Sequence, residues 1–332
     1  MYKSCYRESI DNPVSLTIYS WVFKAQNLSF KTPSLDTCVK CDTLHMKIKF
    51  SEGTEREENE KLMKNHQKRA EKVYDKKSTD RALSIETRDT VVLAFDLQQC
   101  LPTPYLKSGA AFYKHPLWTY NLALRDCTTN TVYCFMWHEA IGGRGANQIA
   151  SCLYYYIMNC MPAEIKHLIF YSDSCSGQNK NIHVVCMFLL AVRNNPNIHS
   201  ITHNFFVAGH THMDCDVDHA AIERAKKKTS MDNYQLVRSC GKKNKFTVIE
   251  MHSDLFLDFA SLLKGPLQQK KIDEKCLPHS YDGPIPISDE KKRDLISLLL
   301  LINPSARSFY TDILSNKDIQ DEHPLLNNSD GD

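Results

Sequence analysis

Residues 91–96 read Val-Val-Leu-Ala-Phe-Asp, five apolar side chains followed by a carboxylate. A short apolar run of this kind predicts a buried strand. Asp96 then lies where the strand emerges at the carboxyl edge of its sheet, the edge at which α/β sheets favour ligand sites. The alternative role for Asp96 is to open the following turn.

A second apolar run, Leu-Ile-Phe-Tyr at 168–171, leads through Ser172 to Asp173. The small and polar residues at 174–181 then turn the chain into a helix whose first amides could face a phosphate. We expect the polar side chains of this loop to contact a DNA backbone: Gln178, Asn179 and Lys180. An Asx turn followed by a helix cap is the alternative.

A third acidic cluster lies in the segment Gly-His-Thr-His-Met-Asp-Cys-Asp-Val-Asp-His at 209–219. If a helix begins near Cys215, Asp216 and Glu223 fall within about 20° of each other, whereas Asp218 points to the other side. We therefore rank Asp216 first as the third acidic ligand, with Asp218 and Glu223 as alternates. His210 is a candidate for orienting water or a scissile phosphate. The alternative for these aspartates is helix capping.

The order of expected elements predicts the fold class. Three strands (91–96, 117–125 and 131–138) precede a helix (147–159), a strand (167–173), a helix (181–193), a strand (200–208) and a helix (217–227). This is the order of elements in RNase H-like proteins. We expect an α/β fold in which a mixed sheet is covered by helices on both faces.

The rest of the chain suggests four regions. Residues 1–85 form a small Cys-containing helical module with a charged helix, 86–235 the RNase H-like core, 236–316 a C-terminal α/β extension and 317–332 a disordered tail. In the extension we expect a strand at 246–251, a short helix at 253–263 and a helix at 288–302 capped by Ser288.

Cys38 and Cys41 have the spacing of half a zinc site. The nearest further ligands are His45 and His66, although neither fits a standard finger spacing. Two ordinary reduced cysteines are the alternative. The chain has 13 cysteines, an odd number, and no secretory signal, which favours the nucleus or cytoplasm over secretion. No apolar run approaches the roughly 20 residues of a membrane span.

The net charge of +2 gives no overall positive field. Any DNA-binding surface must therefore come from local clusters of basic residues. One such cluster follows the acidic segment directly and could hold a phosphate backbone, or form an ordinary solvated helix face: Arg224, Lys226 and Lys227.

Five blocks of the sequence resemble a transposon-derived family that is abundant in insects and other invertebrates. The blocks are Phe-Asp-Leu-Gln-Gln-Cys-Leu-Pro-Thr-Pro at 95–104, Leu-Trp-Thr-Tyr-Asn at 117–121, Met-Trp-His-Glu at 136–139, the loop 173–181 and the segment 209–223. The resemblance extends from about Thr37 to Asn316. One departure is Ser176, where the family pattern leads us to expect glycine.

Members of that family are regarded as relatives of DDE-type transposases with an RNase H-like fold. The resemblance implies acidic site positions at Asp96, Asp173, Asp216, Asp218 and Glu223, and a Cys-x-x-Cys block at Cys38 and Cys41. We expect Asp96, Asp173 and the third carboxylate to hold two Mg²⁺ or Mn²⁺ ions about 4 Å apart for phosphoryl transfer on DNA, with zinc as a structural ion. The alternative function is that of a catalytically inactive remnant that binds DNA or protein. Two further hypotheses are that the chain is a fragment and that it forms a homo-oligomer.

Overall fold

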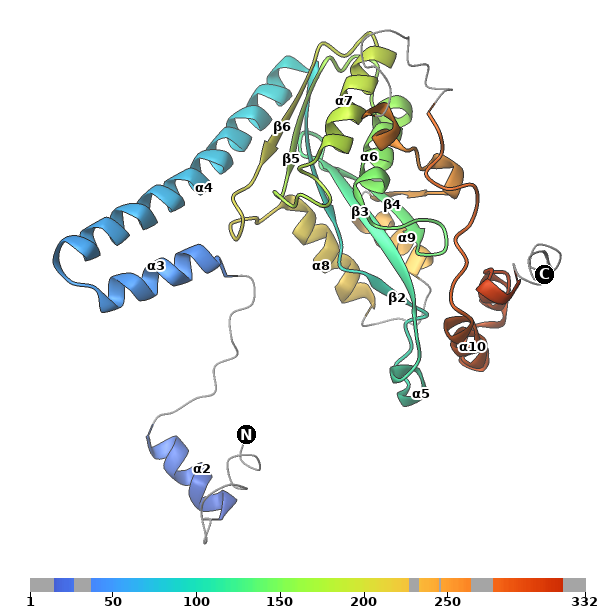
Figure 1. Ribbon diagram of the computed structural model, residues 1–332, viewed down its shortest axis with the longest axis horizontal. Helices are drawn as coiled ribbons and strands as arrows, with labels where there is room; N and C mark the ends of the chain where they lie inside the picture. The colour runs from blue at the N-terminus through green and yellow to red at the C-terminus, as the bar shows by residue number, and fades with distance from the viewer. Residues whose placement is uncertain (1–14, 27–36, 227–232, 245, 264–276, 319–332) are drawn as a thin grey trace, which may run out of the picture.

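A mixed β-sheet forms the centre of the molecule (Figure 1). The computed structural model describes residues 15–26, 37–226, 233–244, 246–263 and 277–318. Across these residues the sheet has seven strands in the order β6-β5-β1-β3-β4-β7, and the short β2 pairs with β3. The strands are β1 (Thr90–Leu97), β2 (Leu101–Thr103), β3 (Leu117–Asp126), β4 (Thr131–His138), β5 (His167–Ser172), β6 (Ser200–Phe205) and β7 (Phe246–Glu250).

The strand order confirms the expected RNase H-like fold. β1, β3 and β4 form an antiparallel meander, while β5 and then β6 add parallel to β1 on its other side. β7 pairs in parallel with β4 at the far edge. The carboxyl ends of β1, β4, β5, β6 and β7 therefore meet at one edge of the sheet.

Helices cover both faces because side chains alternate along each strand. Leu93 and Phe95 of β1 pack against α6 (Ala146–Tyr155) and α7 (Ile182–Asn194) on one face. Val92 and Ala94 pack on the opposite face against α8 (Asp214–Lys226) and α9 (Asn233–Asn244). Both sets are buried, which explains why residues 91–95 form an unbroken apolar run.

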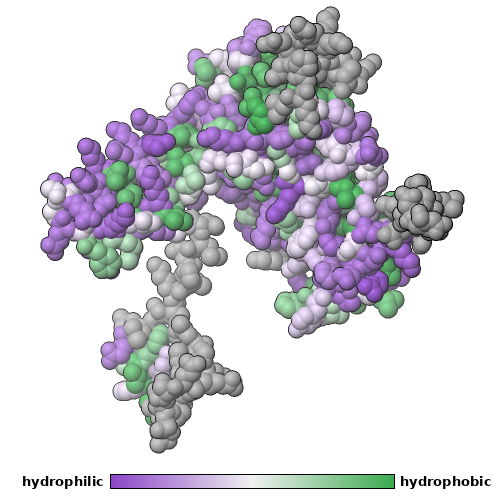
Figure 2. Space-filling model, in the orientation of Figure 1, coloured by the Kyte–Doolittle hydropathy of each residue, from purple (hydrophilic) through white to green (hydrophobic). Residues whose placement is uncertain are grey.

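A 35-residue helix, α4 (Gly53–Thr87), extends away from the sheet, with its C-terminal end at the sheet, and α3 (Val39–Phe50) lies alongside its outer part (Figure 1). This is the charged helix that we expected, and even its buried face is largely polar: Asn59, His66, Ala70, Asp80 and Ser84. Asp80 accepts a hydrogen bond from the Tyr171 hydroxyl at 2.5 Å. The outer surface of α4 seen in Figure 2 is mainly hydrophilic.

The C-terminal elements differ in detail from expectation. Ser288 caps α10 (Asp289–Ser297), accepting from the Lys291 amide at 3.2 Å, but the helix ends well before residue 302. Residues 253–263 form two 3₁₀ turns, Ser253–Leu255 and Phe259–Leu263, in place of an α-helix. The remaining short elements are α2 (Leu16–Ala25), α5 (Gly109–Phe112), a π-helix (Tyr156–Cys160), 3₁₀ turns (Leu299–Leu301 and Pro304–Ala306) and α11 (Arg307–Thr311).

The expected boundaries do not separate independent units. Residue 235 lies inside α9, and β7 beyond it extends the same sheet. Val73 and Tyr74 of the N-terminal module pack against the core. Most of the predicted disordered tail lies outside the described residues. Within the described ranges, no helix is long and apolar enough to cross a bilayer.

Candidate functional site

Two parallel strands bring Asp96 and Asp173 to the same edge of the sheet. β1 and β5 pair in register up to Ala94 and Tyr171, and each aspartate lies two residues further along its own strand direction. Both side chains are half-buried. The sheet thus positions the first two predicted acidic residues side by side at the expected place.

Asp96 lies in an environment that opposes its negative charge. Burial, followed by the nearby carboxylates of Asp173 and Asp216, raises the pKa of Asp96 to about 7. No lysine or arginine pairs with Asp96 among the described residues. Its neighbour there is the imidazole of His219, whose Nδ1 lies 3.9 Å from Asp96 Oδ2. Across the described ranges, none of these three carboxylates forms an ion pair with a lysine or arginine, and a divalent cation would stabilise such an arrangement.

Helix α8 supplies the third carboxylate and a histidine. One ligand atom from each of Asp96, Asp216 and His219 lies within 4.8 Å of the others. Asp216 is in the first turn and is exposed, with Oδ2 accepting from the Met213 amide at 2.8 Å. Burial lowers the pKa of His219 to about 4, so that the imidazole is neutral and able to ligate a metal at neutral pH.

Asp173 is oriented by the loop that follows it. Its Oδ1 accepts from the Cys175 amide at 3.1 Å and from Asn179 Nδ2 at 2.5 Å. The buried Asn179 amide was expected to contact DNA, but it holds the carboxylate instead. Gln178 is half-buried and Lys180 is exposed, with its ammonium 5.3 Å from the centre of the Phe205 ring. The loop is therefore an Asx turn that fixes Asp173 and leaves Lys180 accessible.

Asp218 does not belong to this group, which corrects its place as an alternate ligand. It is buried, and its Oδ1 accepts from Arg125 Nη1 on β3 at 2.7 Å. Asp214 is likewise paired, with Lys77 of α4. Helical phase explains the difference, since Asp218 faces the sheet while Asp216 faces its edge.

Glu223 lies further along α8, outside the group of possible ligands. Its Oε1 accepts from Gln98 Nε2 at 3.3 Å, and Gln98 in turn accepts from Asn121 on β3 at 2.9 Å. Lys226 Nζ lies 3.6 Å from Glu223 Oε2. These contacts join α8 to β3 and to the residue directly after β1. Glu223 therefore positions the helix on the sheet.

The basic residues after the acidic cluster differ in accessibility. Lys226 is buried, with its ammonium 4.8 Å from the centre of the Tyr105 ring, so the structure does not expose it for the predicted contact with DNA. Arg224 is exposed, and its Nε donates to the Ala220 carbonyl at 3.1 Å. Lys227 lies outside the described residues.

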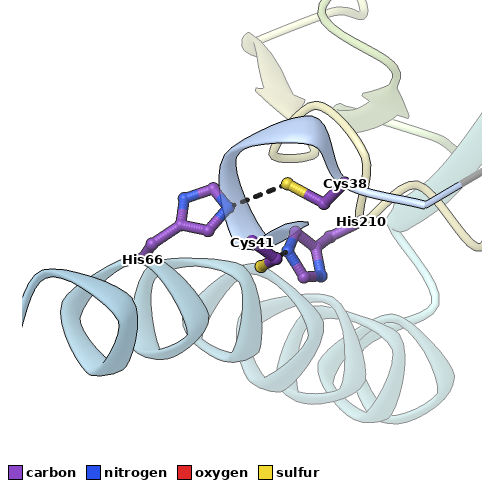
Figure 3. Close-up of side chains that lie close together, drawn as sticks. All are labelled: Cys38, Cys41, His66 and His210. Carbon is purple, nitrogen blue, oxygen red and sulfur yellow. Dashed lines mark hydrogen bonds between the residues drawn. The ribbon is translucent and has the colours of Figure 1, made fainter. Parts of the chain in front are cut away.

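A second cluster joins the N-terminal helices to the loop before α8 (Figure 3). It contains Cys38, Cys41, His66 and His210, whose ligand atoms all lie within 4.8 Å of one another. His210 was expected beside the scissile phosphate, but its Nε2 lies 3.3 Å from Cys41 Sγ. His45, which we expected as a possible zinc ligand, is exposed on α3 and lies outside the cluster.

Sequence reasoning missed the roles of His219, Asn179 and His210. His219 could have been found from its spacing of three residues after Asp216, which places both on one face of a helix. The role of Asn179 depends on the shape of the loop. The partnership of His210 with Cys41 spans 169 residues and has no local signal.

Fold and site together define an RNase H-like domain with acidic side chains at the carboxyl edge of its sheet. Residues 123–282 match a family model described as "Domain of unknown function (DUF7869)". The match begins in β3 and includes Asp173, His210 and Asp216. No curated protein matches the chain.

Among solved structures, the chain is similar to the human cytomegalovirus terminase nuclease domain, in a form described as Mn soaked. The identity is 13% and the TM-score 0.24, over 65% of this chain and 84% of that one. A form described as Mn soaked and inhibitor bound gives 12% identity and a TM-score of 0.23, over 57% and 84%. TM-scores this low carry no argument about the fold, so we assign the fold from the order of the strands.

Proposed function

We propose that this protein is a transposase-derived, divalent-metal-dependent enzyme of phosphoryl transfer or hydrolysis on DNA. The observation that carries the proposal is the convergence of Asp96, Asp173 and Asp216 from two strand ends and a helix of an RNase H-like sheet. The sequence blocks that resemble DDE-type transposase relatives support the transposon-derived origin.

The donor set fits a hard divalent cation. Carboxylate oxygens are the preferred ligands of Mg²⁺ and Mn²⁺, and the raised pKa of Asp96 shows that the site disfavours negative charge in the absence of a cation. Asp96, Asp216 and His219, whose ligand atoms lie within 4.8 Å of one another, would hold the metal. Asp173, at the end of the neighbouring strand, would complete the set of ligands. When bound, such ions activate an attacking oxygen and stabilise the charge that develops on a phosphate.

The chain's own residues would position the substrate and the ligands. Asn179 and the Cys175 amide hold one oxygen of Asp173, which leaves the other free for a cation. Exposed Lys180 and Arg224 offer positive charge to a DNA backbone from the Asp173 loop and from α8. Such contacts would orient the phosphate relative to the carboxylates without reading base sequence.

The test is cleavage of supercoiled plasmid and of labelled oligonucleotides by the purified full chain in Mg²⁺ or Mn²⁺. We expect nicking that requires the metal and falls at least about a hundredfold in Asp96→Asn and in Asp173→Asn, because each removes a charged ligand. Asp75→Asn, which removes an exposed carboxylate from α4, is the matched control.

Two results would contradict the proposal. One is nicking that persists unchanged in both site variants, which would identify a contaminating nuclease. The other is salt-dependent DNA binding by the wild type without any cleavage in either metal. That result would favour the alternative of an inactive DNA-binding remnant.

A further inference from the structure

We propose that Cys38, Cys41, His66 and His210 bind one Zn²⁺ ion, which fixes the helix carrying Asp216. The four side chains come from three segments: the start of α3, the middle of α4, and the loop between β6 and α8 (Figure 3). Two cysteines and two histidines are a ligand set of structural zinc sites. Soft thiolates also exclude Mg²⁺ from this site.

The distances fit tetrahedral coordination. Cys38 Sγ lies 3.1 Å from His66 Nε2, and Cys41 Sγ lies 3.3 Å from His210 Nε2. Bonds of about 2.3 Å to sulfur and 2.0–2.1 Å to nitrogen place neighbouring ligand atoms roughly 3.5 Å apart in a tetrahedron. Both sulfur–nitrogen distances are therefore close to the separation that a tetrahedral ion requires.

The backbone of the loop before α8 approaches the start of α3 closely at this cluster. Gly209, directly before His210, has φ +78°, and a Cβ added there would lie 2.6 Å from both Cα and Cβ of Cys38. The Tyr74 hydroxyl of α4 donates to the His210 carbonyl at 2.6 Å and accepts from the His212 amide at 3.0 Å. The loop is thus pressed against α3 and held by α4, with His210 directed into the cluster.

In the part of the chain that the structure describes, few buried side chains hold helix α3 in place. Of its residues only Leu44 is buried, together with Cys38 at the N-cap. A helix of 12 residues is marginal in water without tertiary contacts. Binding of zinc would provide the missing stabilisation, and the release of one proton from each thiol would give a neutral site with two thiolates and two imidazoles.

The position of the cluster suggests what the ion controls. His210 lies six residues before Asp216, and the intervening residues lead directly into α8. Anchoring His210 to α3 and α4 fixes the start of α8, and with it the direction of the third carboxylate. This coupling rests on the proposed function, whereas the zinc site itself does not.

The test is metal analysis of the full chain, purified without chelator from zinc-supplemented medium. We expect about one zinc per chain, retained in His45→Ala and Cys175→Ser and lost in Cys38→Ser and His210→Ala. The two controls remove an exposed histidine on α3 and an exposed cysteine elsewhere. Less than about a tenth of a zinc per chain in the wild type, or full zinc in both ligand variants, would overturn the proposal.

Cobalt substitution of the wild type keeps the test decisive if the variants fail to fold. Replacing zinc by Co²⁺ should give the intense visible bands of a tetrahedral site with two thiolates. Octahedral cobalt spectra would overturn the assignment. Both measurements need neither DNA nor Mg²⁺, so their failure is distinguishable from failure of the proposed nuclease activity.

Discussion

Asp216 and Asp218 are two residues apart on α8, and their side chains face opposite sides of the helix. Asp216 lies with Asp96 and His219 at the carboxyl edge of the sheet, whereas Asp218 is buried against Arg125 of β3. One carboxylate is therefore available to a cation and the other stabilises the packing of the helix on the sheet.

This separation predicts different results for two similar substitutions. Asp216→Asn should weaken Mn²⁺ binding at least about tenfold and leave stability nearly unchanged, because it removes a ligand that is exposed. Asp218→Asn should lower the free energy of unfolding by about 3 kcal/mol, because it leaves Arg125 partly buried without its charge partner. Calorimetric Mn²⁺ titration and urea unfolding measure the two effects. Equal loss of metal affinity in both variants would contradict the assignment.

The different directions of Asp216 and Asp218 were predictable because helical phase is a local property. The apolar run at 91–95 likewise predicted a central strand. The cluster of Cys38, Cys41, His66 and His210 was only half predictable, since His210 meets Cys41 through the fold and not through spacing. The polar face of α4 was missed because its partners, such as Tyr171, are remote in sequence.

The pKa of Asp96 predicts a pH-dependent difference in stability. Its value of about 7 is above the unfolded value near 4, so the folded state retains a proton that the unfolded state loses between these pH values. Stability contributed by the protonated carboxyl is therefore complete below about pH 4 and is lost as pH rises to about 7. The loss amounts to at most about 4 kcal/mol.

The measurement is urea unfolding of the metal-free protein from pH 4 to 8. Three histidines, the buried His138 and the half-buried His203 and His219, have pKa values lowered to about 4 by desolvation. Their titration makes the folded state more stable as pH rises, opposite to the effect of Asp96. Comparison with Asp96→Asn removes their contribution. The variant should gain stability over the wild type as pH rises, and saturating Mn²⁺ should close the gap. Parallel pH profiles without metal would refute this.

Gly209→Ala should impair the zinc site without touching a ligand. A side chain at φ +78° is strained by about 1–2 kcal/mol, and the added Cβ would overlap Cys38. We expect at least about a tenfold loss of zinc affinity in a competition assay with a chelating dye. Gly177→Ala, where a Cβ meets nothing within 4 Å, is the control and should bind zinc normally. Unchanged affinity in Gly209→Ala would be inconsistent with a close approach of the two segments.

Tyr171→Phe should loosen the contact of α4 with the sheet. It removes the hydroxyl that donates to Asp80 and leaves this buried carboxylate with Lys76, at 2.7 Å. The expected loss is about 1–2 kcal/mol of unfolding free energy, with faster hydrogen exchange in α4. Tyr113→Phe, at a position that is 85% exposed, should behave like the wild type. Equal stability of the two variants would show that the hydrogen bond contributes nothing.

The most direct test of the central claim is a crystal of the full chain soaked in Mn²⁺, analysed by anomalous scattering. We predict manganese bound by Asp96 together with Asp173 and Asp216, at the carboxyl edge of the sheet. A well-ordered site in which these three carboxylates are visible and no manganese lies among them at millimolar Mn²⁺ would contradict a metal-dependent function.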